Sequence, residues 1–224
     1  MYKLKTISIK RRIDQIPNDL KNFSGRTEIA QRLITPPVSV FDWKTGEEVR
    51  VMSQGEADWY TVLRFDDSID AVFVNYPLDR RIIEETALSK GVEFMDVDTF
   101  EEDGAMSSDI VICTDDNKFV VCTVRPSRMM SSRAIQLLAM EYMYWQDRSD
   151  AFHVLFEEDL NVILVDNIRT VVEYYNDETV YDDISMMKNL IARKVFGWDM
   201  ENVIITDEKL IEKLDKLESY NSGR

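Results

Sequence analysis

Two residues of opposite charge stand at the ends of a predicted β-hairpin and are the first candidates for a chemical site. The hairpin covers residues 107–128, in which 110–112 and 119–121 are β-branched and aromatic runs typical of buried strands. Asp109 begins the first strand and Arg125 ends the second, and these ends are neighbours in an antiparallel pair. The pair could be an ordinary salt bridge at the rim of the sheet, or the acid and the cation of an active site.

Metal-dependent cleavage of a phosphodiester requires oxygen ligands for Mg²⁺ and a cation near the attacking water or the scissile phosphate. Asp109 provides one carboxylate, and Glu56 on a predicted helix provides a second. A Lys or, less well, an Arg meets the need for a cation, and Arg125 follows Thr123 and Val124 on the second strand. Because acids and arginines are common at strand ends, this spacing alone is only weakly specific for a nuclease.

Two helices are expected to accompany these strands. The first covers residues 54–65, where Ser53 is a favourable N-cap and Glu56 stands three residues later, at the capping-box position. The second is predicted at 127–146, directly after the hairpin. The side chains expected on its apolar face are Ile135, Leu138, Tyr142 and Trp145.

Strands and helices alternate along the first part of the chain. The expected elements are a small hairpin at 41–51, a helix at 54–65, a strand at 71–76, a helix at 80–90, a strand at 92–99, the hairpin at 107–128, a helix at 127–146 and a strand at 151–156. This order predicts an α/β domain that ends near residue 160.

The remainder of the chain has a different pattern. Residues 165–175 and 181–196 are predicted helices, the second ended by Gly197 as its C-cap. A short strand-like segment at 203–205 follows, and Thr206 caps a last helix. Few strands and several short helices predict a small, mostly helical or winged-helix-like domain.

The composition excludes several classes of protein. The chain has 224 residues, of which 45% are hydrophobic, enough for one good core and a smaller second one. Neither a membrane-spanning run nor a signal peptide is present in the sequence, so a cytoplasmic protein without a membrane partner is expected. Two cysteines without a secretory signal are expected to be reduced. The one histidine, His153, argues against a zinc site and lies in an apolar run, where a core role is expected.

Charge is distributed unevenly. The formal net charge is −15, which opposes unaided binding to a phosphate backbone. Lys10, Arg11 and Arg12 belong to a basic amino end that is the candidate for contact with DNA. Arg128 and Arg133, near the start of the helix predicted at 127–146, are further candidates because the positive end of a helix attracts phosphate. An ordinary surface role explains these two arginines equally well, and any contact with DNA is expected to need a partner protein.

Several segments, in their order and spacing, resemble TnsA, the endonuclease subunit of heteromeric cut-and-paste transposases. The segments are GEADWYTVLRFDDSIDAVFVNYPLD, SSDIVI, VVCTVRPSRMMSS, EYMYW, FHVLFEED and NIRTVVEYYN. The resemblance covers roughly residues 40–220. It implies an α/β fold with a restriction-endonuclease-like mixed sheet flanked by helices, followed by a carboxy-terminal docking domain. We therefore divide the chain into an extension at 1–40, a nuclease domain at 41–163 and a helical docking domain at 164–224.

The resemblance also assigns residues. Glu56 matches the helix glutamate of the family and Asp109 its metal-binding aspartate. Thr123 falls where the family has Gln or Glu, and Arg125 falls on the lysine before proline. Both residues differ from those of the family. The differences matter because a hydroxyl is a poor metal ligand and an arginine cannot act as a base.

Two hypotheses follow from these observations. In the first, the protein is a Mg²⁺-dependent DNA endonuclease that also accepts Mn²⁺ and cuts the 5′ ends of a transposon or a phage element. Glu56, Asp109 and the carbonyl of Val124 would then hold the metal, while Arg125 would stabilise charge at the phosphate. The partners that the resemblance implies are DNA, a TnsB-type transposase and a TnsC-type ATPase. In the second hypothesis, the protein keeps the fold but only binds DNA or the transposase.

Overall fold

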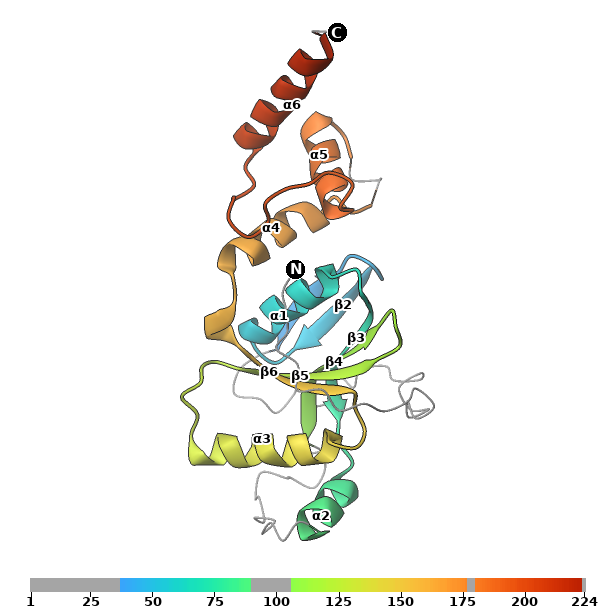
Figure 1. The fold of residues 1–224 in the computed structure, drawn as a ribbon, viewed down its shortest axis with the longest axis vertical. Coiled ribbons are helices and arrows are strands. Elements are labelled where there is room, and N and C mark those ends of the chain that lie inside the picture. The colour runs from blue at the N-terminus through green and yellow to red at the C-terminus, as the bar shows by residue number, and fades with distance from the viewer. Residues whose placement is uncertain (1–36, 90–105, 177–179, 223–224) are drawn as a thin grey trace. The chain divides into compact units, whose positions relative to one another are not determined.

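The structure is a computed structural model, and it describes residues 37–89, 106–176 and 180–222. The described residues form two compact units, one made of 37–40, 48–89 and 106–159 and the other of 41–47, 160–176 and 180–222. Lys10, Arg11 and Arg12, like the strand expected at 92–99, lie outside the described residues. Figure 1 labels the helices and most of the strands along the chain.

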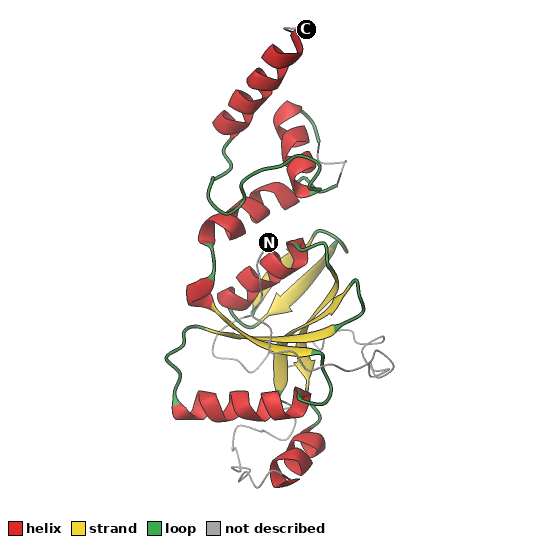
Figure 2. Ribbon diagram, in the orientation of Figure 1, coloured by secondary structure: helices red, strands yellow, loops and turns green. Residues whose placement is uncertain are grey.

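A mixed four-stranded sheet is the centre of the first unit (Figures 1 and 2). Its strands, in spatial order, are β3 (Ile69–Pro77), β4 (Ser107–Thr114), β5 (Phe119–Arg125) and β6 (Ala151–Phe156). β4 runs antiparallel to both β3 and β5, whereas β6 runs parallel to β5. The expected α/β class with a mixed sheet is therefore confirmed.

The predicted hairpin is formed by β4 and β5, with Ile110 opposite Cys122 and Val111 opposite Val121. The turn closes when the backbone N–H of Thr114 donates to the carbonyl of Lys118. Asn117 has a φ of 58°, a left-handed conformation that asparagine tolerates better than most residues. A second predicted hairpin is also present, formed by β1 (Val38–Asp42) and β2 (Glu47–Val51), with Gly46 at a φ of 77° in its turn.

Helices cover both faces of the sheet, with α1 (Gln54–Phe65) on one face and α3 (Ser132–Trp145) on the other (Figure 1). Ser53 caps α1, as predicted, and accepts a hydrogen bond from the backbone N–H of Glu56. α2 (Arg80–Ser89) corresponds to the helix expected at 80–90.

The predicted start of the long helix at residue 127 is wrong. α3 begins at Ser132, and Ser131 is its N-cap because its hydroxyl accepts from the backbone N–H of Ala134. The predicted apolar face is also partly wrong, since Ile135 is 52% exposed and Tyr142 is 36% exposed. The side chains of α3 that are buried are Met140, Glu141, Tyr144 and Trp145.

The core between the sheet and α3 is built around Trp145. Its ring centroid lies 5.4 Å from that of Tyr76 and 5.5 Å from that of Phe119. Its indole Nε1 donates a 2.8 Å hydrogen bond to Oγ of Ser108, which is fully buried on β4. This combination of aromatic packing and a satisfied indole N–H fixes α3 against the strand that carries Asp109. His153 is buried in β6, as expected, and burial lowers its pKa.

The second unit contains α4 (Val162–Val172), α5 (Asp183–Ala192) and α6 (Asp207–Ser222). The strand-like segment expected at 203–205 is not a strand, because the buried side chain of Asn167 takes its backbone hydrogen bonds. The helix predicted to end at Gly197 ends earlier, and Lys194, with a φ of 58°, takes the left-handed position after its C-cap. Thr206 precedes the last helix and its hydroxyl accepts from Lys209 N–H, as predicted.

Within the part of the chain that the structure describes, no helix combines the length and the apolar composition needed to cross a membrane.

Candidate functional site

The carboxylate of Asp109 accepts three hydrogen bonds from consecutive residues of β5. Its Oδ2 lies 2.9 Å from Oγ1 of Thr123, 2.7 Å from the backbone nitrogen of Val124 and 2.9 Å from Nη1 of Arg125. The strand register explains this convergence. Ile110 is paired with Cys122, so the next residues along the two antiparallel strands, Asp109 and Thr123, lie opposite each other. The hairpin therefore brings together four of the residues that the sequence proposed.

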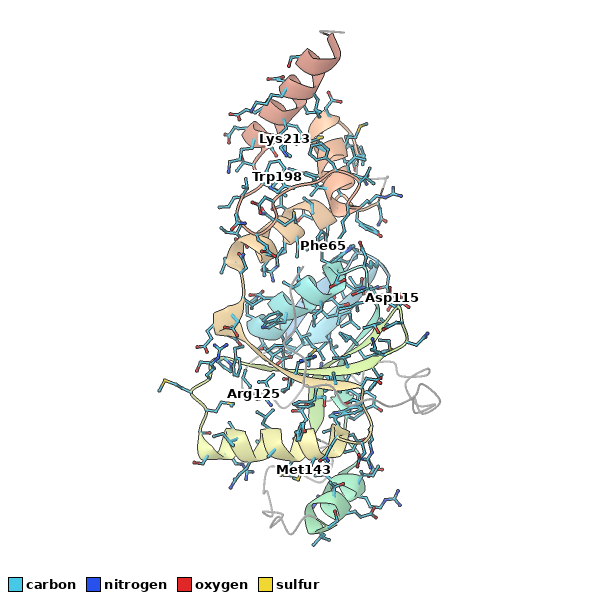
Figure 3. The ribbon with its side chains drawn as sticks, in the orientation of Figure 1. Phe65, Asp115, Arg125, Met143, Trp198 and Lys213 are labelled. Carbon is cyan, nitrogen blue, oxygen red and sulfur yellow. The ribbon has the colours of Figure 1, made fainter. Side chains whose placement is uncertain are left out.

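Arg125 joins three oxygen-bearing groups. Its Nη1 donates to Oδ2 of Asp109 and, at 2.6 Å, to the carbonyl oxygen of Val124, while its Nη2 lies 3.6 Å from Oε2 of Glu141 on α3. Figure 3 labels Arg125 between the sheet and α3. The side chains of Asp109 and Arg125 are about one-fifth exposed, so a ligand can reach the pair from solvent.

Glu141 is a residue of this site that the sequence analysis missed. Its side chain is only 1% exposed, and its Oε1 is buried without a hydrogen-bond partner among the described residues. Burial raises the pKa of Glu141, and the charge of Asp109 acts in the same direction, whereas the nearby hydroxyls of Ser108 and Thr123 and the charge of Arg125 lower it. A lone acid inside the apolar run of residues 137–145 was the signal that could have revealed it.

Glu56 lies in the first turn of α1 and is also buried, with 7% of its surface exposed. Its Oε2 accepts a 2.8 Å hydrogen bond from the backbone N–H of Met52, and its Oε1 accepts from the hydroxyl of Ser53. In a standard capping box this carboxylate would accept from the backbone N–H of the N-cap, Ser53. Here it accepts from the preceding residue, Met52. Burial raises the pKa of Glu56 to about 7, and the negative charge of Asp109 contributes to the same shift. The two acids therefore interact electrostatically.

The site has the donor types that Mg²⁺ prefers, but the guanidinium already uses two of them. Carboxylate oxygens and a backbone carbonyl are hard ligands, and Mg²⁺ commonly takes one or two carboxylates together with water. Nη1 of Arg125 lies between the Asp109 carboxylate and the Val124 carbonyl, which are two of the predicted metal ligands. Among the residues that the structure describes, no group of three or more His, Cys, Asp or Glu side chains is arranged to hold a metal. A divalent cation would therefore have to compete with Arg125 or use other oxygens of these residues.

Thr123 does not take the place of the missing acid. Its side chain is fully buried, and its hydroxyl donates to Asp109. A hydroxyl that donates to the neighbouring carboxylate fixes the orientation of that carboxylate, whereas it adds no negative charge for a metal.

The two arginines near the start of α3 have different surroundings. Arg128 donates to Glu158 and to Asp159 over 2.5 Å each, and its guanidinium lies 4.6 Å from the centroid of the Phe156 ring. Two carboxylates thus neutralise the charge that was expected to meet a phosphate. Arg133 lies in the first turn of α3 and is half-buried. Contact of either residue with DNA stays a prediction.

None of the models of known protein families matches this sequence, and none of the curated proteins matches it.

Proposed function

We propose that the protein is a metal-dependent DNA endonuclease of the TnsA type, which hydrolyses phosphodiesters at the ends of a mobile element. The observation that supports this function best is the convergence of Asp109, the Val124 carbonyl and Arg125 at the end of a β4–β5 hairpin. A mixed sheet with helices on both faces is compatible with a restriction-endonuclease-like core. Buried carboxyl groups with raised pKa values near this point are typical of functional sites.

The residues of the site divide the work between binding and charge stabilisation. Asp109 and the carbonyl of Val124, with Glu56 nearby, would hold Mg²⁺ or Mn²⁺, which supplies Lewis-acid activation of water and phosphate. Thr123 and the backbone N–H of Val124 hold the Asp109 carboxylate in one orientation. A guanidinium is a donor of hydrogen bonds and not a base, so the role of Arg125 is to stabilise negative charge at the phosphate.

The acidic balance of the chain supports a subunit that reaches DNA through partners. With a net charge of −15, free association with DNA is unfavourable at physiological salt. We therefore propose that a TnsB-type transposase and a TnsC-type ATPase deliver it, and that the second unit is a winged-helix-like docking domain.

A plasmid-nicking assay tests the proposal. The full chain is incubated with supercoiled plasmid and Mg²⁺ or Mn²⁺, with and without the partner transposase, and compared with Asp109→Asn. The variant is expected to lose at least about 100-fold in rate, because a metal ligand and the Arg125 partner are lost together. Asp116→Asn, in the exposed turn of the same hairpin, is the matched control and should cut normally. Equal cutting by Asp109→Asn would refute the assignment.

One observation favours a second function, a DNA- or transposase-binding subunit without catalysis. Arg125 takes the place between Asp109 and the Val124 carbonyl that a metal would use, and Thr123 replaces the family's Gln or Glu. Such a subunit would bind element ends together with its transposase in the presence of EDTA. Absence of nicking with either metal and with the partner, combined with EDTA-resistant binding, would establish this second function over the first.

A further inference from the structure

The buried oxygen of Glu141 is a costly feature that the proposed roles do not explain. Oε1 of Glu141 is the one buried side-chain oxygen or nitrogen without a hydrogen-bond partner among the described side chains. An unsatisfied buried polar atom destabilises a fold by about 1–3 kcal/mol, and more when it belongs to a charged group. Native structures keep such atoms where a ligand, an ion or a water completes them.

Glu141 is held in place and cannot easily turn away to solvent. Trp145, one helical turn later on α3, is hydrogen-bonded through its indole to Ser108 on β4. Met140 and Tyr144, on either side of Glu141 along the helix, are buried in the same core. The carboxylate of Glu141 is therefore fixed beside the start of β4, where Asp109 contacts β5.

Glu141 lies where it can supply the carboxylate that Thr123 lacks. Thr123 and Arg125 follow Phe119 and Val121 at every second position of β5, so all four lie on the face that packs against α3. Glu141 approaches this face from the helix, and one guanidinium separates its carboxylate from that of Asp109. The site therefore contains a second carboxylate, supplied by the helix in place of the strand.

We propose that Glu141 and Asp109 form a divalent-cation site, in which Glu141 supplies from α3 the negative charge that Thr123 does not supply from β5. The inference rests on the proposed function, because it assigns a further ligand to the same cation. Arg125 pairs with both carboxylates when no divalent cation is bound, and its single positive charge offsets one of their two negative charges. A cation that binds Asp109 and Glu141 replaces Arg125 on these oxygens and leaves its guanidinium available to a phosphate.

Binding of Mn²⁺, measured on the full chain by electron paramagnetic resonance without DNA, tests the proposal. Glu141→Gln keeps the shape of the side chain and removes its charge, and it should weaken Mn²⁺ binding by more than about tenfold. Glu84→Gln is the matched control, because Glu84 also pairs with an arginine, Arg80, but on the surface of α2. Its Mn²⁺ affinity should equal that of the unchanged protein. A folded Glu141→Gln variant with an affinity within twofold of the unchanged protein would overturn the proposal, as would absence of Mn²⁺ binding by the unchanged chain.

A second variant keeps the test decisive if Glu141→Gln does not fold. In the double variant Thr123→Glu, Glu141→Ala the carboxylate moves from the helix to the strand, and the smaller residue at 141 makes room for the larger one at 123. Binding of Mn²⁺ by the folded double variant, with an affinity like that of the unchanged protein, supports the proposal. A folded double variant that does not bind Mn²⁺ contradicts it.

The outcome for Glu141 is separable from the outcome for the nuclease. Mn²⁺ binding that depends on Glu141, without DNA nicking, would keep the cation site and refute the proposed endonuclease. Nicking that depends on Asp109, with Mn²⁺ affinity unchanged in Glu141→Gln, would keep the endonuclease and refute the role of Glu141.

Discussion

Nη1 of Arg125 lies 2.9 Å from Oδ2 of Asp109, although the two residues are at the far ends of adjacent strands in the chain. The hairpin between them creates this contact, since its turn brings the start of β4 beside the end of β5. Arg125 also faces Glu141, so one guanidinium is the shared cationic partner of two carboxylates that are partly or fully withdrawn from water. Removal of that guanidinium should therefore have a large effect.

Arg125→Ala should destabilise the metal-free protein by about 3–5 kcal/mol, because it leaves the buried Glu141 and the partly buried Asp109 without a counter-charge. Mn²⁺ should restore much of this loss, since a divalent cation supplies the missing positive charge, and the restoration should exceed the stabilisation of the unchanged protein. Denaturation curves in EDTA and in Mn²⁺ measure both effects. Arg80→Ala, which breaks an exposed pair with Glu84, is the control and should cost less than about 1 kcal/mol. An equal Mn²⁺ effect on Arg125→Ala and on the unchanged chain would contradict this account.

Glu56 should make the protein less stable as pH rises. Its folded pKa of about 7 is above the ordinary value of 4.5, so the folded state holds a proton that the unfolded state has lost between these values. The unfolding free energy should fall by about 2–3 kcal/mol between pH 5 and pH 8 from this residue alone.

Glu56→Gln should remove that part of the pH dependence and leave the protein more stable than the unchanged chain at pH 8. The amide oxygen of Gln can still accept from the backbone N–H of Met52, so the cap is retained. Urea denaturation at the two pH values in EDTA provides the measurement. A pH dependence that is the same in both proteins would show that Glu56 ionises normally in the folded state.

Local sequence signals predicted the helix and the hairpin that carry the site. The features that the sequence did not predict depend on packing between residues distant in the chain. Ser53 as an N-cap and the polar turn of the β4–β5 hairpin depend on neighbouring residues only, and both predictions are confirmed. Glu141 escaped prediction because a charged residue in a helix is normally assigned to solvent, and its burial depends on how α3 is turned against the sheet. The rotation of α3 about its own axis is set by contacts between residues distant in sequence, such as that of Trp145 with Ser108.

In the second unit, too, a contact distant in sequence made a local prediction wrong. Residues 203–205 have the composition of a strand, but the structure offers them no strand partner among its described residues. The side chain of Asn167, on α4, replaces that partner. A polar residue of this kind looks like an ordinary surface residue in the sequence.

Gly55 and Glu157 should be energetically coupled. A Cβ at Gly55 would lie 2.1 Å from the Oε1 of Glu157, so Gly55→Ala must push that side chain aside. Alanine in a helix is otherwise favoured over glycine by up to about 1 kcal/mol. We therefore expect Gly55→Ala to destabilise the unchanged protein and to stabilise Glu157→Ala. A double-mutant cycle in denaturant measures the coupling, and additive effects would show that Glu157 moves without cost.

Asn167→Ala should destabilise the second unit by about 2–4 kcal/mol, because one buried side chain satisfies three backbone groups. Its Nδ2 donates to the carbonyls of Met200 and Val203, and its Oδ1 accepts from the backbone N–H of Ile205. Hydrogen exchange should accelerate at the amide of Ile205, and calorimetry gives the loss of stability. Asn202→Ala is the control, because Asn202 is exposed and bonds only within its own turn, to Asp199. Protection of the Ile205 amide that is unchanged in Asn167→Ala would mean that packing, and not Asn167, holds this segment against α4.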